Sequence, residues 1–169
     1  MNKLTLIFSL LLQCGITWAQ TDLSAWEGRW RGTLAIYNEK GLAQETTMGL
    51  NILKDGKEWK WQIIYGEGDS QDFRDYSLRP TSNPSQFELD EHNGIVLRLS
   101  YLHHSFHSIF EMNNTTLVVS YSLENDEMVF RTQFSPAEEV ITSGGNNENT
   151  PIVKARKTTT FQIAHLTKS

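Results

Sequence analysis

The chain has 169 residues, with 15 lysines and arginines against 20 aspartates and glutamates, so its formal net charge at neutral pH is −5. This length suits one domain with a substantial hydrophobic core. The acidic balance argues against nucleic acid and against anionic membrane surfaces as partners.

The first residues are typical of a secretory signal peptide. Lys3 precedes the apolar run LTLIFSLLL, and a small-x-small cleavage pattern ends at Ala19. The run is too short to span a bilayer. We therefore predict a signal peptide over residues 1–19, cleavage before Gln20, one mature domain over 20–169, and a secreted or periplasmic location.

The only cysteine, Cys14, lies within that leader. Lipoprotein anchoring would make Cys14 the first mature residue, but such sites usually have a small residue before the cysteine, and Gln13 stands there. Cleavage after Ala19 is the favoured interpretation, and it leaves the mature chain with neither a disulfide nor a thiol nucleophile. No later run approaches the bilayer thickness, so no membrane span is expected.

Beyond the leader, apolar and polar residues alternate with a period of two in short segments, as half-buried strands do. The clearest segment is EWKWQIIYG, where alternate residues from Trp59 to Tyr65 share one face. Asp55-Gly56 and Asn93-Gly94 are strong hairpin signals, because both pairs tolerate positive φ. About ten strands should pair sequentially as antiparallel hairpins. In chain order, they are expected over residues 32–37, 46–53, 58–66, 73–79, 86–89, 94–101, 106–112, 114–125, 127–134 and 158–166.

One connection, residues 135–157, is long. It contains the stretch SGGNNENTP, whose composition predicts a mobile, irregular loop. The segment PAEEVI before that stretch could form one helical turn.

Alternation on every strand is compatible with a sandwich or a closed barrel, and a hairpin-connected meander favours the barrel because closure removes strand edges. The predicted fold is therefore all-β, a single antiparallel up-and-down barrel of about 8–10 strands. Its aromatic side chains either fill the interior or line a pocket, and the sequence leaves both open. The inward set is expected to be Trp30, Trp59, Trp61, Tyr65, Phe87, Tyr101, Phe106, Phe110, Tyr121, Phe130, Phe134 and Phe161.

The stretch LSAWEGRWRGTL resembles the start of calycin barrels, the superfamily of lipocalins, fatty-acid-binding proteins and avidins. In those families a short helical turn precedes a Gly-x-Trp element on the first strand, and Gly28 and Trp30 match it. The resemblance implies that Gly28 lets the chain bend into the barrel floor and that Trp30 plugs the closed end. It also implies a basic side chain over the tryptophan, for which Arg131 is the best match and Arg156 the second.

The favoured function is a lipocalin-like binding protein that holds a small, largely apolar ligand among inward aromatic side chains. Such rings give contact area, and tyrosine and tryptophan tips give a few hydrogen bonds. No cofactor is expected, and the oligomeric state is left open. The expected ligand-binding residues are Trp59, Trp61, Tyr65, Tyr101, Phe110, Tyr121, Phe130 and His165.

One alternative is an enzyme, or a metal- or haem-binding barrel, built on His103, His104 and His107. On a strand, the first and last of these would lie about 13 Å apart, too far for one metal ion. A solvated hairpin tip is therefore the favoured interpretation. The charged stretch DFRDYSLR, from Asp72 to Arg79, is interpreted as exposed ion pairs. In the enzyme alternative, its Asp72 and Asp75 could act as paired carboxylates at the barrel mouth. A further alternative is a filled barrel that acts through protein–protein contacts.

Overall fold

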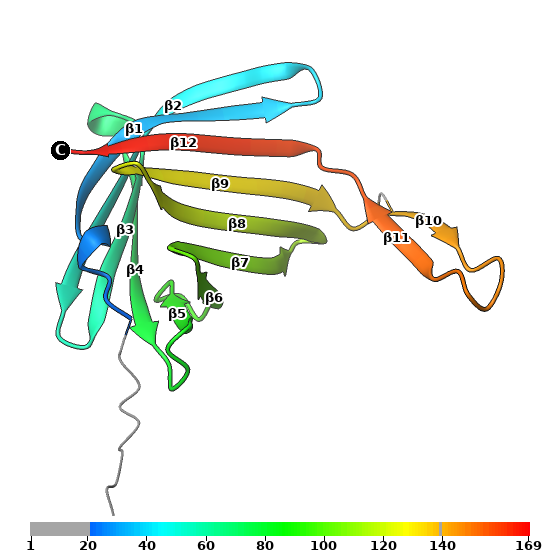
Figure 1. Cartoon of the computed structure of the whole chain (residues 1–169). Coiled ribbons are helices and arrows are strands. Elements are labelled where there is room, and N and C mark those ends of the chain that lie inside the picture. Colours follow the sequence, from blue (N-terminus) through cyan, green and yellow to red (C-terminus); the bar gives the residue numbers. More distant parts are fainter. Residues whose placement is uncertain (1–20, 139) are drawn as a thin grey trace, which may run out of the picture.

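Ten antiparallel strands close into a barrel, in the order β1-β12-β9-β8-β7-β6-β5-β4-β3-β2, with β2 returning to β1 (Figure 1). The computed structural model describes residues 21–138 and 140–169, so the predicted signal peptide and Cys14 lie outside the described residues. Within these ranges, no helix is long and apolar enough to cross a bilayer. The all-β up-and-down barrel predicted from the sequence is confirmed.

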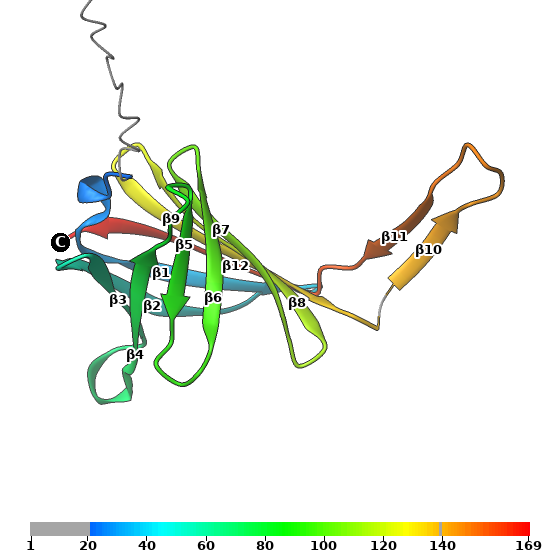
Figure 2. The same ribbon diagram turned by 90° about the horizontal axis from the view of Figure 1, so that it is seen from below.

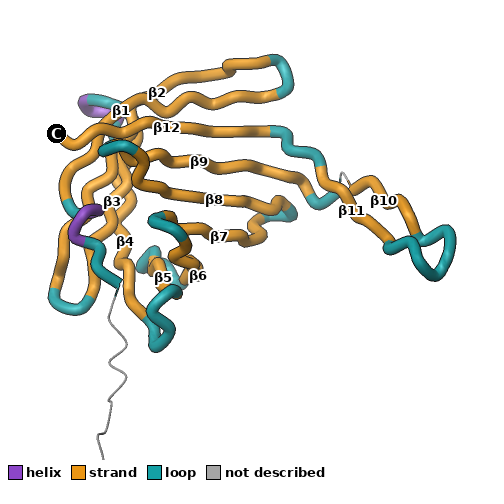
Figure 3. Tube along the Cα trace, viewed as in Figure 1, coloured by secondary structure: helices purple, strands orange, loops and turns teal. Residues whose placement is uncertain are grey.

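The barrel strands agree with the predicted segments to within five residues at their ends, and nearly all of the described chain is strand or turn (Figure 3). Two short 3-10 helices, η1 (Ser24–Trp26) and η2 (Gly68–Ser70), complete the barrel. The barrel strands are β1 (Gly28–Asn38), β2 (Gly41–Asp55), β3 (Glu58–Tyr65), β4 (Asp72–Pro80), β5 (Gln86–Asp90), β6 (Val96–Leu102), β7 (Ser105–Met112), β8 (Thr115–Glu124), β9 (Glu127–Pro136) and β12 (Thr160–Lys168).

Tight turns connect β6 to β7, β7 to β8 and β8 to β9. In each, the two central residues have positive φ: His103 and His104, Asn113 and Asn114, and Asn125 and Asp126. Two consecutive left-handed residues match the right-handed twist of the flanking strands, which is why such turns favour asparagine, aspartate and glycine. These turns hold neighbouring strands in sequential antiparallel register.

The segment between β9 and β12 differs from the prediction. Val140–Gly144 (β10) and Ile152–Arg156 (β11) form a two-stranded antiparallel sheet that extends away from the barrel (Figure 2). The first three residues of β10 (Val140, Ile141 and Thr142) and the first two of β11 (Ile152 and Val153) are β-branched, which favours extended backbone. The irregular loop predicted over 135–157 is thus a hairpin, and its mobility stays a prediction.

One end of the barrel is closed by aromatic packing. Trp26, on η1, is 1% exposed, and its ring centroid lies 4.8 Å from that of Phe106 and 6.2 Å from that of Trp61. Phe106 also packs against Phe87 and Tyr101, at 5.2 and 4.8 Å. The contacts of Phe106 with Trp26 and with Phe87 are edge to face, an arrangement that aromatic quadrupoles favour, and the other two are tilted. This cluster fills the barrel where η1 crosses it.

On the outer surface, a row of polar side chains crosses four adjacent strands. The Arg31 guanidinium donates to Asn51 Oδ1 at 2.9 Å, and Asn51 Nδ2 donates to Gln62 Oε1 at 2.7 Å. Gln62 Nε2 in turn donates to Asp75 Oδ1 at 2.7 Å. Asp75, in the charged stretch singled out from the sequence, therefore belongs to the outer face of the sheet.

Candidate functional site

Beyond the aromatic cluster the barrel encloses a cavity of about 680 Å³. Phe106 and Tyr121 line this cavity and also pack against Trp61, with ring centroids 5.7 and 5.2 Å from it. These two rings therefore form the floor that separates the cavity from the closed end. The barrel is filled at one end and hollow beyond it, which resolves the question that the sequence left open.

Most of the cavity wall is apolar. It is built from alternate residues of strands around the barrel, because every second side chain of a barrel strand points inward. The apolar lining comprises Leu34, Ile36, Ile63, Leu89, Leu97, Leu99, Phe110, Met112, Leu117, Val119, Phe130 and Phe134.

A polar group of side chains lies on the β3–β5 side of the same cavity: Tyr65, Asp72, Arg74, Tyr76 and Glu91. Arg74 Nε lies 3.1 Å from Asp72 Oδ2, and its guanidinium carbon lies 5.3 Å from the centroid of the Tyr65 ring. Asp72 and Arg74 are about half exposed, so they lie at the cavity mouth. The cavity thus combines a large apolar wall with a charged group on its β3–β5 side. Further polar residues lie elsewhere in the lining: Gln44, Thr46, Ser70, Ser108, Thr132 and Gln162.

The cavity tyrosines are held in their neutral form. Burial raises the pKa of Tyr65 to about 12, against a smaller opposing effect of the Arg74 cation. Burial also raises the pKa of Tyr121 well above its usual value. Both hydroxyls therefore stay protonated across the physiological range, available to donate or accept one hydrogen bond to a ligand.

The raised pKa of Tyr65 predicts a loss of stability at alkaline pH. Below pH 10 the phenol is protonated in both states, whereas between pH 10 and about 12 the unfolded chain ionises and the folded chain does not. Unfolding then releases a proton, so the free energy of unfolding should fall by roughly 1.4 kcal/mol per pH unit in that window from this group. Tyr65→Phe should make the alkaline decline shallower in urea titrations, and Tyr37→Phe, on the outer face, is the matched control. An unchanged decline in Tyr65→Phe would contradict the assignment.

Thr132 supplies an unpartnered polar atom in the cavity wall. The residue is 3% exposed, and its Oγ1 has no hydrogen-bond partner among the described residues. An unpaired buried hydroxyl usually costs about 1–3 kcal/mol. A ligand with a polar atom against this wall would satisfy it.

Four of the eight residues predicted to bind a ligand line the cavity: Tyr65, Phe110, Tyr121 and Phe130. Three others, Trp59, Trp61 and Tyr101, belong to the aromatic packing of the closed end and are absent from the cavity lining. Trp59, for example, packs edge to face on Phe87 at 6.4 Å and donates Nε1 to Glu27. These three residues therefore pack in the core of the closed end and do not contact the cavity.

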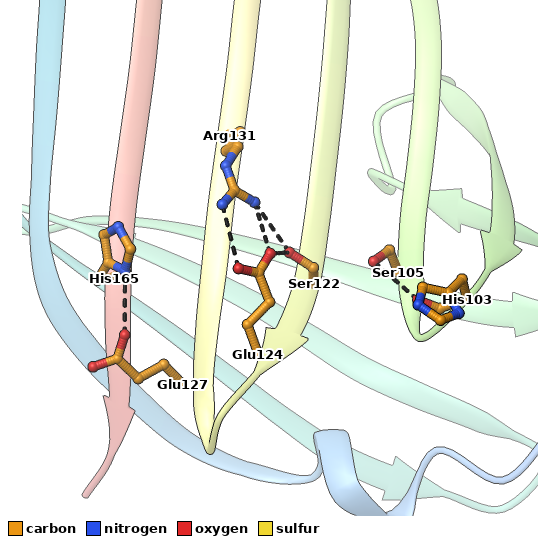
Figure 4. Close-up of polar contacts among 7 residues, drawn as sticks. All are labelled: His103, Ser105, Ser122, Glu124, Glu127, Arg131 and His165. Atoms are coloured by element: carbon orange, nitrogen blue, oxygen red, sulfur yellow. Dashed lines mark hydrogen bonds and ion pairs between the residues drawn. The ribbon is translucent and has the colours of Figure 1, made fainter.

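The prediction that His165 points into the barrel is wrong. The inward face of β12 carries Gln162, which lines the cavity, and the fully buried Ala164 and Leu166. His165 lies on the opposite face, where its Nδ1 is 3.2 Å from Glu127 Oε2 (Figure 4). Phe161 shares this outer face.

Arg131 does not cover Trp30. Its guanidinium pairs on the outer face with Glu124, at 3.0 Å, and with the Ser122 hydroxyl (Figure 4). Hydrogen bonds from Arg131 and from the Ser122 hydroxyl hold the pKa of the Glu124 carboxyl below its usual value. The basic group over Trp30 is instead Lys168, whose Nζ lies 4.9 Å from the ring centroid.

The backbone conformation explains the glycine of the Gly-x-Trp element, because a positive φ disfavours residues with a Cβ. Gly28 has φ +136, and a Cβ there would lie 2.8 Å from Lys168 Cε. Trp30 itself is 2% exposed and donates Nε1 to the Trp26 carbonyl oxygen at 2.9 Å. Arg156, the second candidate for the basic group, lies on β11 and faces Glu111 at 3.9 Å.

The histidines lie outside the cavity. His103 and His104 are the two central residues of the β6–β7 turn, and His107 lies exposed on β7. Among the described residues, no group of three histidine, cysteine, aspartate or glutamate side chains is arranged to hold a metal ion.

Arg74 and Glu91 were not predicted as cavity residues, and Asp72 was placed at the barrel mouth only in the enzyme alternative. A signal was present in the alternation: counting back in twos from the buried Leu78 reaches Arg74 and Asp72. Counting forward in twos from Phe87 reaches Leu89 and Glu91. The interpretation of Asp72 and Arg74 as exposed ion pairs overlooked that they alternate in phase with Leu78.

No protein-family model matches the chain, and no curated protein does. Among solved structures, the S-type phycobiliprotein lyase from Guillardia theta is similar, with a TM-score of 0.57 and 8% sequence identity. The match covers 86% of this chain and 89% of the lyase chain. The architecture is calycin-like. At such low identity the likeness concerns the fold, and it carries no activity from one protein to the other.

Proposed function

We propose that this chain is an exported binding protein that holds a small, largely apolar ligand in the barrel cavity. The observation that carries the proposal is the cavity of about 680 Å³, whose mainly apolar wall is interspersed with polar groups and carries the charged side chains of Asp72, Arg74 and Glu91. Ligand sites in proteins usually measure about 300–1,000 Å³ and have this composition. The aromatic floor of Phe106 and Tyr121 limits how deep a ligand reaches.

The fold itself does not separate binding from catalysis, because a similar solved structure is named as a lyase. Two features favour binding. The histidine group that the sequence offered for catalysis lies at a turn and on the outer face. The cavity tyrosines are held neutral by burial, so they are poor bases near neutral pH.

Two neighbouring valines on β8 provide a direct test. Val119 lines the cavity, whereas Val118 is 40% exposed on the outer face. Val119→Trp should fill part of the cavity and weaken binding of the neutral fluorescent probe N-phenyl-1-naphthylamine by about tenfold or more, which corresponds to about 1.4 kcal/mol. Val118→Trp, the control, should bind the probe like the parent protein.

Probe binding is measured by fluorescence titration, and native mass spectrometry of the same samples gives the number bound. One saturable site that is lost in Val119→Trp and kept in Val118→Trp supports the cavity. Equal binding by both variants, or no binding by the parent, would overturn the proposal.

A further inference from the structure

The charges that line the cavity do not cancel. Asp72, Arg74 and Glu91 are the charged side chains in the described lining, so two carboxylates face one guanidinium and one negative charge remains. Arg74 is already engaged, since its Nε lies 3.1 Å from Asp72 Oδ2. The surplus charge is therefore that of Glu91.

Glu91 has a neutral partner in place of a cation. Its Oε2 accepts a hydrogen bond from Asn93 Nδ2 at 3.2 Å, and no lysine, arginine or histidine within the described residues forms an ion pair with it. Its charge also reaches the inner phenols. Burial is the main reason that the pKa of Tyr76 lies above its usual value, and the Glu91 carboxylate raises that pKa further.

The aromatic rings of the lining also suit a cation. Tyrosine and phenylalanine rings attract cations through their electron-rich faces, and Arg74 already lies over the ring of Tyr65 in this manner. A carboxylate entering the same mouth would meet Glu91 and would have to compete with Asp72 for the guanidinium. The acidic balance of the whole chain, −5, adds attraction for cations in solution.

We propose that the ligand is a cationic amphiphile, an amine or quaternary ammonium on an apolar body, with Glu91 as the counter-charge of its head group. The apolar body lies against the wall formed by residues such as Phe110, Leu117 and Phe134. This inference rests on the proposed binding function and deepens it, because it names the chemical class that the cavity selects.

Three probes with the same twelve-carbon chain isolate the head group: dodecylamine, dodecan-1-ol and dodecanoate. Their affinities are measured by titration calorimetry at pH 7 and low salt, at concentrations below the micellar range. We expect the amine to bind most tightly, then the alcohol, then the carboxylate, with about tenfold or more between the amine and the carboxylate. A charge pair near a protein surface is strong enough for such a difference. Added salt should narrow it.

Glu91→Gln should reduce the amine affinity by about tenfold and leave the alcohol unchanged. Glu88→Gln is the matched control, because it makes the same change in net charge on the outer face of β5, where Glu88 lines a separate surface groove. Asp72→Asn should raise the affinity for dodecanoate by releasing Arg74 from its partner.

The outcomes separate this inference from the function on which it rests. If the alcohol binds but the carboxylate binds as tightly as the amine, or if Glu91→Gln weakens the amine no more than Glu88→Gln, the cationic preference is overturned and the binding function stands. If none of the three probes binds, both proposals are overturned.

Discussion

Trp26→Ala should lower the free energy of unfolding by about 3–5 kcal/mol, the usual cost of truncating a large buried aromatic side chain. Trp26 lies in η1, outside the barrel strands, yet it is 1% exposed and contacts three other rings of the closed end. Alanine would leave a void beneath Phe106 and Trp61 that the surrounding strands cannot collapse to fill. Urea denaturation followed by circular dichroism measures the change.

The control for that substitution is Ile109→Ala on the outer face of β7. Ile109 is 72% exposed, so its truncation should change the stability by less than about 0.5 kcal/mol. A Trp26→Ala variant as stable as Ile109→Ala would mean that η1 does not close the barrel in solution.

The second large effect is expected at the seam where the last strand meets the first. Gly32 on β1 is paired with Leu166 on β12, and a Cβ at Gly32 would lie 2.0 Å from the backbone oxygen of His165. Gly32→Ala therefore requires the two strands to separate, because the obstructing atom belongs to the backbone. Overpacking usually costs about 1–3 kcal/mol, and we expect Gly32→Ala at or above the upper end of that range.

Gly49→Ala is the matched control on the neighbouring strand. A Cβ at Gly49 would lie 2.6 Å from Nη1 of Arg31, the far end of a flexible side chain that can move. It should cost clearly less than Gly32→Ala in the same urea titration. Hydrogen exchange of the backbone amides between β1 and β12 should be faster in Gly32→Ala and unchanged in Gly49→Ala. Equal stability of the two variants would contradict the inference that close packing of β1 against β12 requires glycine at position 32.

The number of barrel strands and their sequential pairing could be predicted because they depend on local signals. Alternation marks each strand, and turn pairs such as Asp55-Gly56 set its end. The face of β12 could not be predicted in this way. Phe161 and Ile163 alternate as large apolar residues, yet Phe161 packs outside against Tyr37 at 6.4 Å, while the smaller Ala164 is fully buried inside.

The sequence also could not show which inward residues fill the closed end of the barrel and which line the cavity. Trp61 and Tyr65 stand four residues apart on one face of β3, and alternation treats them alike. Trp61 meets Trp26 and Phe106 in the closed end, whereas Tyr65 meets the cavity, because η1 crosses the barrel at one end alone. That difference comes from three-dimensional packing between segments far apart in the chain.

The β10–β11 hairpin leaves the barrel's hydrogen-bonded circuit untouched. β9 pairs directly with β12 from Phe134 opposite Thr160 onward, so the chain departs and returns at adjacent points of one ladder. The cost of closing such an excursion grows slowly with its length. The β10–β11 hairpin should therefore tolerate shortening, or replacement by an unrelated peptide, without a change in the barrel.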